Sequence, residues 1–405
     1  MKIINNSHCR MCRGTEFEEV INFGDTPLVN GLLTEEEFGT EEVKNLTVVQ
    51  CQKCFLVQIK DVVDSEEIYR NVDYLYFSSD MPELSNYFKI FAQYVGRRFL
   101  TYGDSVAEIG SNDGILLQHL REYNVLGIDP AINVALRALK RGIPTLPLFF
   151  TYKLAQKIKN EYGQFQLIAG FNCIAHLNDL NDVMLGVKEL LTPDGVFVVE
   201  CNYWGDMVKN TNYALIYHDH FSYFTLKNWV DYANKNKLKV FDAITTPAQG
   251  GSLRVFMAHN REMTDRCQNL LRDEEKSNLN SYEVAQKYGK SAHRKAKRLG
   301  NLIRRLKADG YSIAGYGAAA KGFSVLKLAG LDEKQIDFFV DDSPAKQDKF
   351  TPISHIPIYA RDNIKEPDYF FITAPNYKDV IIKKEKEYIK NGGKFITINS
   401  EIIDG

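Results

Sequence analysis

The sequence predicts an α/β protein made of a small N-terminal β module followed by two doubly wound units of unequal size. Three observations support this fold class: paired cysteines near the start, two separate strand-turn-helix patterns with glycine-rich turns, and a charged, strand-free segment between those patterns. A chain of 405 residues is longer than one hydrophobic core usually holds, so several domains are expected. We place the domain bounds at residues 1–72, 73–260 and 261–405.

The composition is that of an ordinary globular protein, with 44% hydrophobic and 25% charged residues. The formal net charge of −2 gives no reason to expect nucleic acid or an anionic membrane as a partner. The first residues lack the apolar segment of a secretory signal, and no apolar run approaches the roughly 18 residues of a membrane helix. We therefore expect a cytoplasmic protein with no nucleic-acid or membrane partner, whose cysteines are reduced or metal-bound.

Four of the seven cysteines form two CxxC pairs, Cys9–Cys12 and Cys51–Cys54. A gap of two residues lets two thiolates bind one ion from a tight turn, and two such turns complete a tetrahedron, so the spacing predicts one Zn2+ site. A site with four thiolates has no open position for water or substrate, so this zinc is expected to be structural. The alternatives are two unrelated turns or a redox pair, and the repeated spacing argues against both.

The first glycine-rich turn lies in DSVAEIGSNDG, residues 104–114, which reads as a strand entering a turn. ILLQHLREY then reads as a helix, and NVLGIDP as the next strand, which ends on Asp129. The turn lacks the full GxGxxG of a dinucleotide site and fits the S-adenosylmethionine variant of the doubly wound fold better.

In that variant the glycines let the amino-acid part of the cofactor approach the backbone, and an acid after the second strand binds the ribose hydroxyls. The alternative is a strand-turn-helix unit that binds no ligand. The candidate cofactor residues are Glu108, Gly110, Asn112, Gly114 and Asp129.

The alternation of strands and helices continues beyond this turn. A strand from Phe165 leads into a turn that contains His176, and a later strand ends on Asn202. The carboxyl ends of such strands meet at one edge of the sheet, where ligands bind in open α/β folds. The segment IYHDHFSYFT, residues 216–225, follows directly, so we expect it near this edge although its aromatic residues alone would suggest a piece of core. A late strand, residues 252–258, carries Arg254.

The third unit follows a charged segment, residues 261–309, which we interpret as the solvated face of a long bridging helix. In YSIAGYGAAAKG a strand leads through Gly315 and Gly317 to Lys321. Such a turn opens a helix N-terminus to a diphosphate, with Lys321 as a point charge beside it. One alternative is a nicotinamide cofactor with Asp341 on its ribose, which the displaced third glycine weakens, and the other is a turn without a ligand.

At this point the whole chain resembles the zinc-containing sugar C-methyltransferases of deoxysugar biosynthesis. The resemblance implies an α/β fold with a small N-terminal Zn-binding β module, a doubly wound methyltransferase domain, and a second, smaller Rossmann-like C-terminal domain that contributes to nucleotide-sugar binding. Two positions depart from the family: Asp219 stands where a glutamate is usual, and Pro375-Asn376 stands where a Trp-Asn pair is usual. The motifs that carry the resemblance are the four cysteines, EIGSNDG, AHLNDL, IYHDHFSYFT, GGSLRVF, GYGAAAKG, DDSPAKQ and IPIY.

The family resemblance implies S-adenosylmethionine-dependent methylation at carbon 3 of a nucleotide-linked 4-keto-6-deoxy sugar, and leans towards a monomer. A ketone at carbon 4 acidifies the hydrogen on carbon 3, so a base must remove it and the enolate must be stabilised. The resemblance implies His220 as that base. We expect Asp219 to orient or polarise His220 or to contact the sugar, and Tyr217 and His176 to hydrogen-bond the enolate oxygen.

Further residues are expected to contact the substrate. Tyr74 and Tyr76 belong to a tyrosine-rich segment that lies over the active site in the family. Arg254 either pairs with a phosphate or caps the strand edge. His218, Tyr223 and Phe224 are expected to be scaffold. The full set of candidate substrate contacts is Tyr74, Tyr76, Asn202, Arg254, Gly315, Gly317 and Lys321.

Two other functions stay open at the level of the sequence. The first is an O- or N-methyltransferase acting on a nucleotide sugar or a related metabolite, which would need His220 less because a hydroxyl or amine is already a nucleophile. The second is a non-enzymatic zinc- and nucleotide-binding module, against which the intact Glu108, Gly110, Asp129 and His220 speak.

Overall fold

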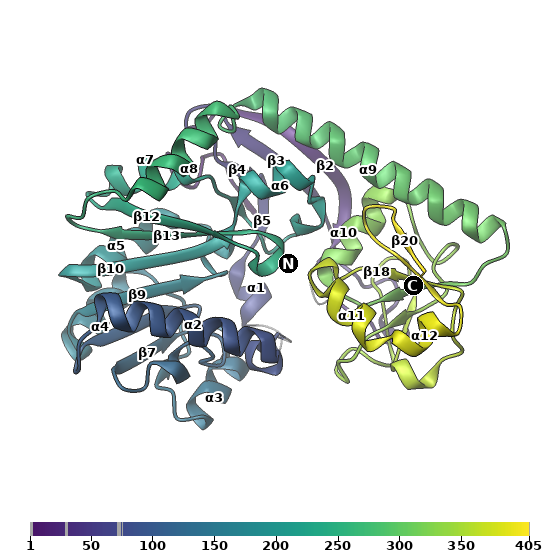
Figure 1. Ribbon diagram of the computed structural model, residues 1–405, viewed down its shortest axis with the longest axis horizontal. Coiled ribbons are helices and arrows are strands. Elements are labelled where there is room, and N and C mark those ends of the chain that lie inside the picture. The colour runs from purple at the N-terminus through teal and green to yellow at the C-terminus, as the bar shows by residue number, and fades with distance from the viewer. Residues whose placement is uncertain (1–2, 29–30, 71–73, 75, 405) are drawn as a thin grey trace.

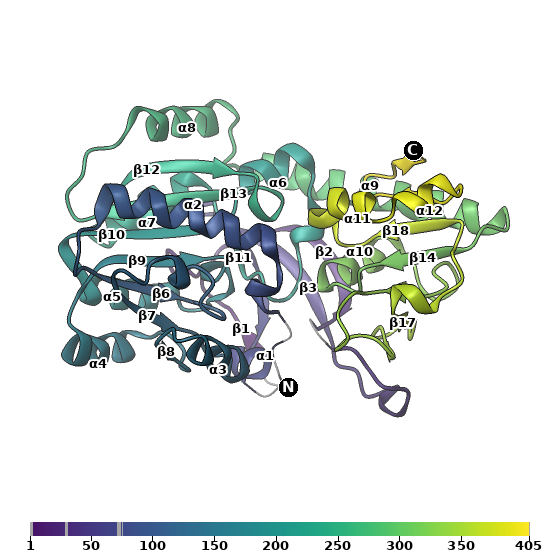
Figure 2. The same ribbon diagram turned by 60° about the horizontal axis from the view of Figure 1, so that its bottom comes forward.

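The computed structural model of the chain describes residues 3–28, 31–70, 74 and 76–404. Within these ranges the strands form four sheets, which belong to a small N-terminal module, a central domain and a C-terminal domain. Figures 1 and 2 both place strands β2 (Phe17–Pro27) and β3 (Val43–Cys51) of the module between the two larger units. The predicted α/β fold class, with a small β module and a second, smaller C-terminal domain, is confirmed.

The N-terminal module is a small antiparallel β structure built around the cysteines. Strand β4 (Val57–Ile59) pairs with β3, which pairs with β2, while β1 (Ile3–Asn5) pairs with β5 (Asp61–Val63). Helix α1 (Ser65–Tyr69) follows, capped by the Asp64 carboxylate.

The two CxxC pairs form matching turns. Arg13 N donates to Cys9 O at 3.0 Å, and Phe55 N donates to Cys51 O at 2.9 Å. Arg13 and Phe55 both have positive φ, 63° and 60°, as the residue after such a turn requires. The Sγ atoms of Cys9, Cys12, Cys51 and Cys54 lie within 4.8 Å of one another. Four convergent thiolates of this kind fit the predicted structural zinc site.

The central domain is a seven-stranded sheet in the order β12-β13-β10-β9-β6-β7-β8. Strands β6 to β10 run parallel, and β13 and β12 add an antiparallel edge. This order follows the doubly wound pattern, which starts in the middle of the sheet and proceeds outwards in both directions. The bounds are β6 (Ser105–Ile109), β7 (Asn124–Ile128), β8 (Thr145–Leu146), β9 (Phe165–Phe171), β10 (Leu191–Asn202), β12 (Lys239–Thr246) and β13 (Ser252–Ala258).

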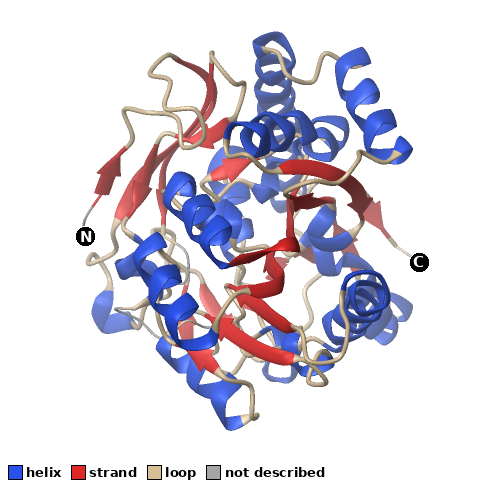
Figure 3. Ribbon diagram, turned by 90° about the vertical axis from the view of Figure 1, so that its left-hand side faces the viewer, coloured by secondary structure: helices blue, strands red, loops and turns tan. Residues whose placement is uncertain are grey.

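Helices cover both faces of this sheet (Figure 3). Successive residues of β6 divide between the faces: Val106 packs in the cluster of Phe91 from α2, and Ala107 in the cluster of Val187 from α5. The helices of the domain are α2 (Pro82–Phe99), α3 (Ile132–Lys140), α4 (Tyr152–Tyr162), α5 (Leu180–Leu190), α6 (Trp204–Asn210) and α7 (Leu226–Lys235).

The helix predicted for ILLQHLREY is wrong. The structure has only the short 3-10 helix η3 (Leu117–His119) between β6 and β7. Ile115, Leu116 and Leu117 are all buried in succession. An amphipathic helix would turn one of three consecutive side chains towards solvent, so this apolar run is better buried by a compact irregular turn.

The charged segment after the central domain forms two helices, α8 (Asp265–Lys276) and α9 (Tyr282–Ala308), in place of the single bridging helix expected. Helix α9 runs along the top of Figure 1 from the N-terminal module to the C-terminal domain. It approaches β2 closely at Gly289, where a Cβ would lie 1.9 Å from Val20 O. Glycine at this position therefore sets the distance between helix and strand.

The C-terminal domain contains a second sheet in the order β16-β17-β15-β14-β18-β19-β20. Its five inner strands are parallel, as predicted, and the two outermost strands are antiparallel. The strands are β14 (Ile313–Tyr316), β15 (Phe339–Val340), β16 (Lys349–Phe350), β17 (Pro357–Tyr359), β18 (Tyr369–Ile372), β19 (Lys394–Ile396) and β20 (Ile402–Ile403). The helices are α10 (Ala320–Ala329), α11 (Lys378–Lys384) and α12 (Lys386–Lys390).

A short strand from the segment 216–225 joins the module to the central domain. Strand β11 (Ser222–Tyr223) pairs antiparallel with β4 and so completes the four-stranded sheet of the module. Just before it, Phe221 O accepts from Ile59 N at 2.9 Å, and Phe221 N donates to Ala175 O at 2.7 Å. The histidine-rich segment is thereby fixed to both units.

Among the described helices, none is long and apolar enough to cross a lipid bilayer.

Replacing Cys51 with serine removes one of the four thiolates. We expect the unaltered protein to bind about one zinc ion per chain and the Cys51→Ser protein to bind none. We expect a lower Tm as well, because metal binding contributes to the folding of small metal modules. Elemental analysis and thermal unfolding measure the two effects. Cys267→Ala is the control, since that buried cysteine lies in α8 outside the cluster; a Cys51→Ser protein that keeps its full zinc content would contradict the assignment.

Candidate active site

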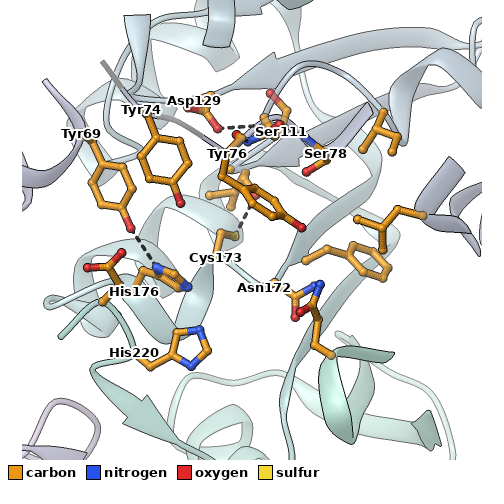
Figure 4. Close-up of a pocket in the computed structure, with 18 of the residues that line it drawn as sticks. Tyr69, Tyr74, Tyr76, Ser78, Ser111, Asp129, Asn172, Cys173, His176 and His220 are labelled. Carbon is orange, nitrogen blue, oxygen red and sulfur yellow. Dashed lines mark hydrogen bonds between the residues drawn. The ribbon is translucent and has the colours of Figure 1, made fainter. Parts of the chain in front are cut away.

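A cavity of about 350 Å3 lies at the carboxyl ends of the central parallel strands and is lined by all three units. The N-terminal module contributes Tyr69, and the C-terminal domain contributes Lys321, Lys346, Asn376 and Tyr377. Figure 4 shows its walls, with Tyr74 and Tyr76 facing the histidines across the open space. A site shared between domains at this edge of a sheet is a common place for ligand binding.

The floor of the cavity is the turn after β6, where the backbone leaves no room for side chains. Gly110 has a φ of +67°, and a Cβ there would lie 2.4 Å from Cys173 Cβ. Gly114 has a φ of +79°, and its Cβ would lie 2.9 Å from a side-chain carbon of Ile143. Both predicted glycines are thus required by the path of the chain, and Gly110 brings the backbone to the cavity surface.

Two buried carboxyl groups flank this turn. Asp129 accepts hydrogen bonds from Asn112 N at 2.8 Å and Ala131 N at 3.0 Å, and burial raises its pKa to about 6. Burial also holds the pKa of Glu108 well above its usual value, with the charges of Asp129 and Asp113 adding to the effect. Within the described part of the chain, Glu108 Oε2 has no hydrogen-bond partner. An unpartnered acceptor in a cavity wall fits a ligand that brings hydroxyl or ammonium donors, as S-adenosylmethionine does.

The side chain of Asn112, in the turn after β6, hydrogen-bonds the backbone of residues 76 and 78. Its Oδ1 accepts from Ser78 N at 2.8 Å, and its Nδ2 donates to Tyr76 O at 3.1 Å. The Asn133 side chain binds the backbone of Tyr74 with the same pair of hydrogen bonds: its Oδ1 accepts from Tyr74 N at 3.4 Å, and its Nδ2 donates to Tyr74 O at 3.0 Å. Asn112, which was predicted as a cofactor contact, lines the cavity. Its side-chain amide also positions the backbone of Tyr76 and Ser78.

Two histidines from different elements meet in the cavity. His176 ends the 3-10 helix η4 (Ile174–His176), and its ring lies 4.8 Å from that of His220, centroid to centroid, at 71°. Each imidazole has a tyrosine partner: Tyr69 Oη lies 2.8 Å from His176 Nδ1, and Tyr217 Oη lies 2.7 Å from His220 Nε2. Figure 4 shows the first of these hydrogen bonds and the two rings side by side.

Burial decides the protonation of this group. It lowers the pKa of His176 to about 4 and that of His220 well below its usual value, and the charge of Lys321 adds to both shifts. Both imidazoles are therefore neutral near pH 7 and able to accept a proton. Burial raises the pKa of Asp219, which is adjacent in sequence to His220, to about 7, so this carboxyl group titrates near neutral pH.

The predicted substrate contacts divide into two groups. Tyr74, Tyr76, Asn202 and Lys321 line the cavity. Arg254 does not reach it: its Nε donates to Glu200 Oε2 at 2.7 Å and its Nη2 to Tyr87 Oη at 2.7 Å. This guanidinium is buried in an ion pair between β10 and β13.

Gly315 and Gly317 also lie outside the cavity lining. A Cβ at Gly315 would lie 2.2 Å from the Phe339 ring, and Gly317, with φ +91°, packs against Ala374. Asp341, the alternative ribose acceptor, already binds Ala318 N at 2.8 Å and Lys346 Nζ at 3.0 Å. The Lys346 ammonium thus offsets the charge of Asp341 within the domain.

The lining residues that were not predicted as site residues include Tyr69, Gln249, Lys346, Asn376 and Tyr377. Most of them lie in the N-terminal module or the C-terminal domain, far along the chain from the cofactor turn, so no motif spacing connects them with that turn. Lys346 had a signal, because it lies in DDSPAKQ, a motif that carried the family resemblance. Gln249 has a positive φ of 52° inside the turn of AQGG, which only the structure reveals.

The fold, the glycine turn and its acids define an S-adenosylmethionine-dependent methyltransferase with a four-cysteine zinc site. Family models match most of the chain: a putative zinc binding domain at residues 9–69, a methyltransferase domain at 84–242, and a C-methyltransferase C-terminal domain at 247–398. The C-methyltransferase NovU of Streptomyces niveus is 35% identical over 397 residues, which cover 96% of this chain and 94% of that protein. The chain therefore belongs to this C-methyltransferase family.

More distant likenesses cover only part of the chain. A ubiquinone biosynthesis O-methyltransferase of Bartonella tribocorum is 24% identical over 152 residues, 34% of this chain and 62% of that protein. The solved structure of the PH0226 protein from Pyrococcus horikoshii matches with a TM-score of 0.37 and 14% identity, over 47% of this chain and 98% of that one. The family assignment rests on the full-length relative and the family models.

Asp129→Asn should weaken binding of S-adenosylmethionine by roughly 10- to 100-fold, because a charged acceptor is replaced by a neutral one in a buried site. Isothermal titration calorimetry with S-adenosylmethionine measures the Kd. Asp104→Asn is the matched control, since Asp104 lies just before β6 and outside the cavity lining. Equal Kd values for Asp129→Asn and the unaltered protein would remove Asp129 from the cofactor site.

Proposed function

We propose that the protein methylates carbon 3 of a nucleotide-linked 4-keto-6-deoxy sugar, through an enolate that forms when His220 removes a proton. The observation that carries this proposal is the pair of buried, neutral imidazoles, each bonded to a tyrosine hydroxyl, in the cavity that holds the cofactor turn. A carbon acceptor becomes a nucleophile only after it loses a proton, whereas a hydroxyl or amine acceptor already has a lone pair. A base of this kind is therefore expected in a C-methyltransferase.

His220 suits the role of base because its lowered pKa keeps the ring neutral at the pH where the enzyme works. In this step the C–H bond at carbon 3 breaks, the proton moves to His220, and the electron pair shifts towards the oxygen at carbon 4. Asp219, next to His220 in the sequence and equally enclosed, carries a negative charge above its pKa of about 7 and offsets the positive charge of the imidazolium.

The oxygen at carbon 4 gains negative charge and needs donors. The pKa of Tyr69 is raised well above its usual value by burial, so its hydroxyl stays protonated and donates to His176 Nδ1. This hydrogen bond leaves the proton of a neutral His176 on Nε2, where the imidazole can donate to the enolate oxygen. Tyr217 is the second donor: its hydroxyl also stays protonated and gives its one hydrogen to the enolate oxygen, while its lone pair accepts from His220 Nε2 once that atom has taken up the proton.

When bound, S-adenosylmethionine supplies an electrophilic methyl group for the nucleophilic carbon. The chain itself supplies position: Gly110, Asp129 and Glu108 hold one side of the cavity, and the histidine pair holds the other. Tyr74 and Tyr76 line the same cavity and face the histidines across it, so their rings occupy space that water would otherwise fill.

The nucleotide-sugar part of the proposal rests on the C-terminal domain. Its Lys321, Lys346 and Asn376 reach the same cavity as the cofactor turn, and cationic and amide groups suit a polar, anionic substrate. The net charge of −2 supports a small-molecule partner over nucleic acid. We propose in addition a cytoplasmic monomer, in line with the family resemblance.

His220→Asn tests the base directly. In heavy water and without the methyl donor, the unaltered protein should exchange the hydrogen at carbon 3 of its keto sugar, and His220→Asn should exchange it roughly 100- to 10,000-fold more slowly. Mass spectrometry or proton NMR follows the exchange. The sugar is tested as its thymidine, guanosine and cytidine diphosphate.

His218→Asn is the matched control for this experiment, because His218 does not line the cavity. Its Nε2 forms a hydrogen bond with Thr26 Oγ1 at 2.8 Å. Its exchange rate should equal that of the unaltered protein. Equal exchange by His220→Asn would reject His220 as the base, and a methylated oxygen or nitrogen in the product would reject C-methylation of the sugar.

The rate of exchange should fall as the pH drops through about 7, because Asp219 then gains a proton and no longer offsets the imidazolium. The tyrosines whose pKa Asp219 affects, Tyr69, Tyr74 and Tyr217, have pKa values raised well above their usual value and do not titrate in this range. In Asp219→Asn this limb of the pH profile should disappear and the plateau should be lower. A pH profile of the unaltered protein with the same shape as that of Asp219→Asn would show that the charge is not needed, since Lys321, whose pKa is about 8, titrates in both proteins.

A further inference from the structure

Lys321 stands at the point where the C-terminal domain meets the cavity. It is the second residue of α10, and its Nζ donates to Gln249 Oε1 at 3.4 Å, a long contact to a neutral group. Burial lowers its pKa to about 8, which still leaves most of the population charged at pH 7. A cation enclosed in this way is costly to keep unless another group offsets it.

The other lysine of this wall, Lys346, differs in that respect. Its Nζ lies 3.0 Å from Asp341 Oδ2 and 3.1 Å from Ala318 O, so its charge is already offset within the domain. Among the residues that the structure describes, no carboxylate forms an ion pair with Lys321. Lys321 is thus the cation of the cavity wall that is available to a substrate.

Lys321 lines the same cavity as His176 and His220, and its charge adds to burial in lowering the pKa of both imidazoles. Asp219 raises the pKa of Tyr69 and of Tyr217. The cavity therefore presents a positive charge beside the histidine pair, where a proton transfer would create a new negative charge on the substrate.

We propose that Lys321 is a catalytic residue that binds the developing enolate oxygen of the keto sugar. The inference rests on the proposed function and extends it to the C-terminal domain. In the step concerned, the C–H bond at carbon 3 breaks, the proton passes to His220, and the electrons of the C=O bond move onto the oxygen at carbon 4. Lys321 keeps its own proton and donates a hydrogen bond to that oxygen, beside His176 and Tyr217.

This role differs from the diphosphate contact that the sequence suggested for Lys321. A lysine that holds only the diphosphate binds ground state and transition state equally, so its loss raises KM without slowing the step at saturation. A lysine on the enolate oxygen acts only as charge develops there, so its loss slows proton removal even when the sugar is saturating.

The experiment compares Lys321→Met with Lys321→Arg and with Lys327→Met as the matched control, because Lys327 is an exposed residue of the same helix and lies outside the cavity lining. Exchange of the carbon-3 hydrogen is measured in heavy water over a range of sugar concentrations, with the thymidine, guanosine and cytidine diphosphate 4-keto-6-deoxy sugars and no methyl donor. Calorimetry with S-adenosylmethionine checks that each variant retains a folded central domain.

Lys321→Met should lower the saturating exchange rate by roughly 100- to 1,000-fold with little change in KM. Lys321→Arg, which keeps the charge, should recover part of that rate, and Lys327→Met should exchange at the rate of the unaltered protein. A raised KM with an unchanged saturating rate in Lys321→Met would overturn the inference in favour of a diphosphate contact. If the unaltered protein exchanges none of the sugars, the proposed function itself fails, and this inference fails with it.

Discussion

The peptide of Phe221 is the constraint on which the candidate active site depends. Its N–H donates to Ala175 O at 2.7 Å, and its carbonyl accepts from Ile59 N at 2.9 Å, so one residue joins the central domain to the N-terminal module. His220 and His176, each next to one end of the first hydrogen bond, are thereby brought to a ring distance of 4.8 Å. The buried Arg10 guanidinium supports the arrangement, since it donates to Ile59 O at 2.7 Å and lies over the Phe221 ring at 5.6 Å. The peptide of one residue, just before strand β11, thus holds the two histidines of the proposed chemistry together.

The same constraint explains how a closed zinc site can matter for methyl transfer without touching the reactants. Zinc fixes the turns that hold the module, the module positions β4 and Tyr69, and these in turn position the two histidines. The C-terminal domain closes the cavity from the other side with Lys321 and Lys346. In the mechanism that we propose, each unit supplies a different requirement of carbon methylation: the central domain binds the donor, the module orients a histidine, and the C-terminal domain adds positive charge.

Sequence reasoning reached the features that a short segment determines by itself. The CxxC spacing, the glycines at positive φ and the acid after β7 follow from local geometry, and each lies in the structure where the pattern indicated. Features that depend on tertiary contacts were not accessible. Tyr69 meets His176 across 107 positions of the chain, and Arg254 is bound by Glu200 on a neighbouring strand. The three apolar residues after Gly114 are buried in succession, and the segment does not form the helix that its composition suggested.

The central claim is that the new bond joins two carbon atoms, and NMR of a doubly labelled product tests it most directly. The protein is incubated with S-adenosylmethionine that carries a 13C-methyl group and with a nucleotide-linked 4-keto-6-deoxy sugar labelled with 13C throughout its ring. We predict a one-bond carbon–carbon coupling between the new methyl group and carbon 3 of the sugar. A labelled methyl group without such a coupling, attached to oxygen or nitrogen, would contradict the account.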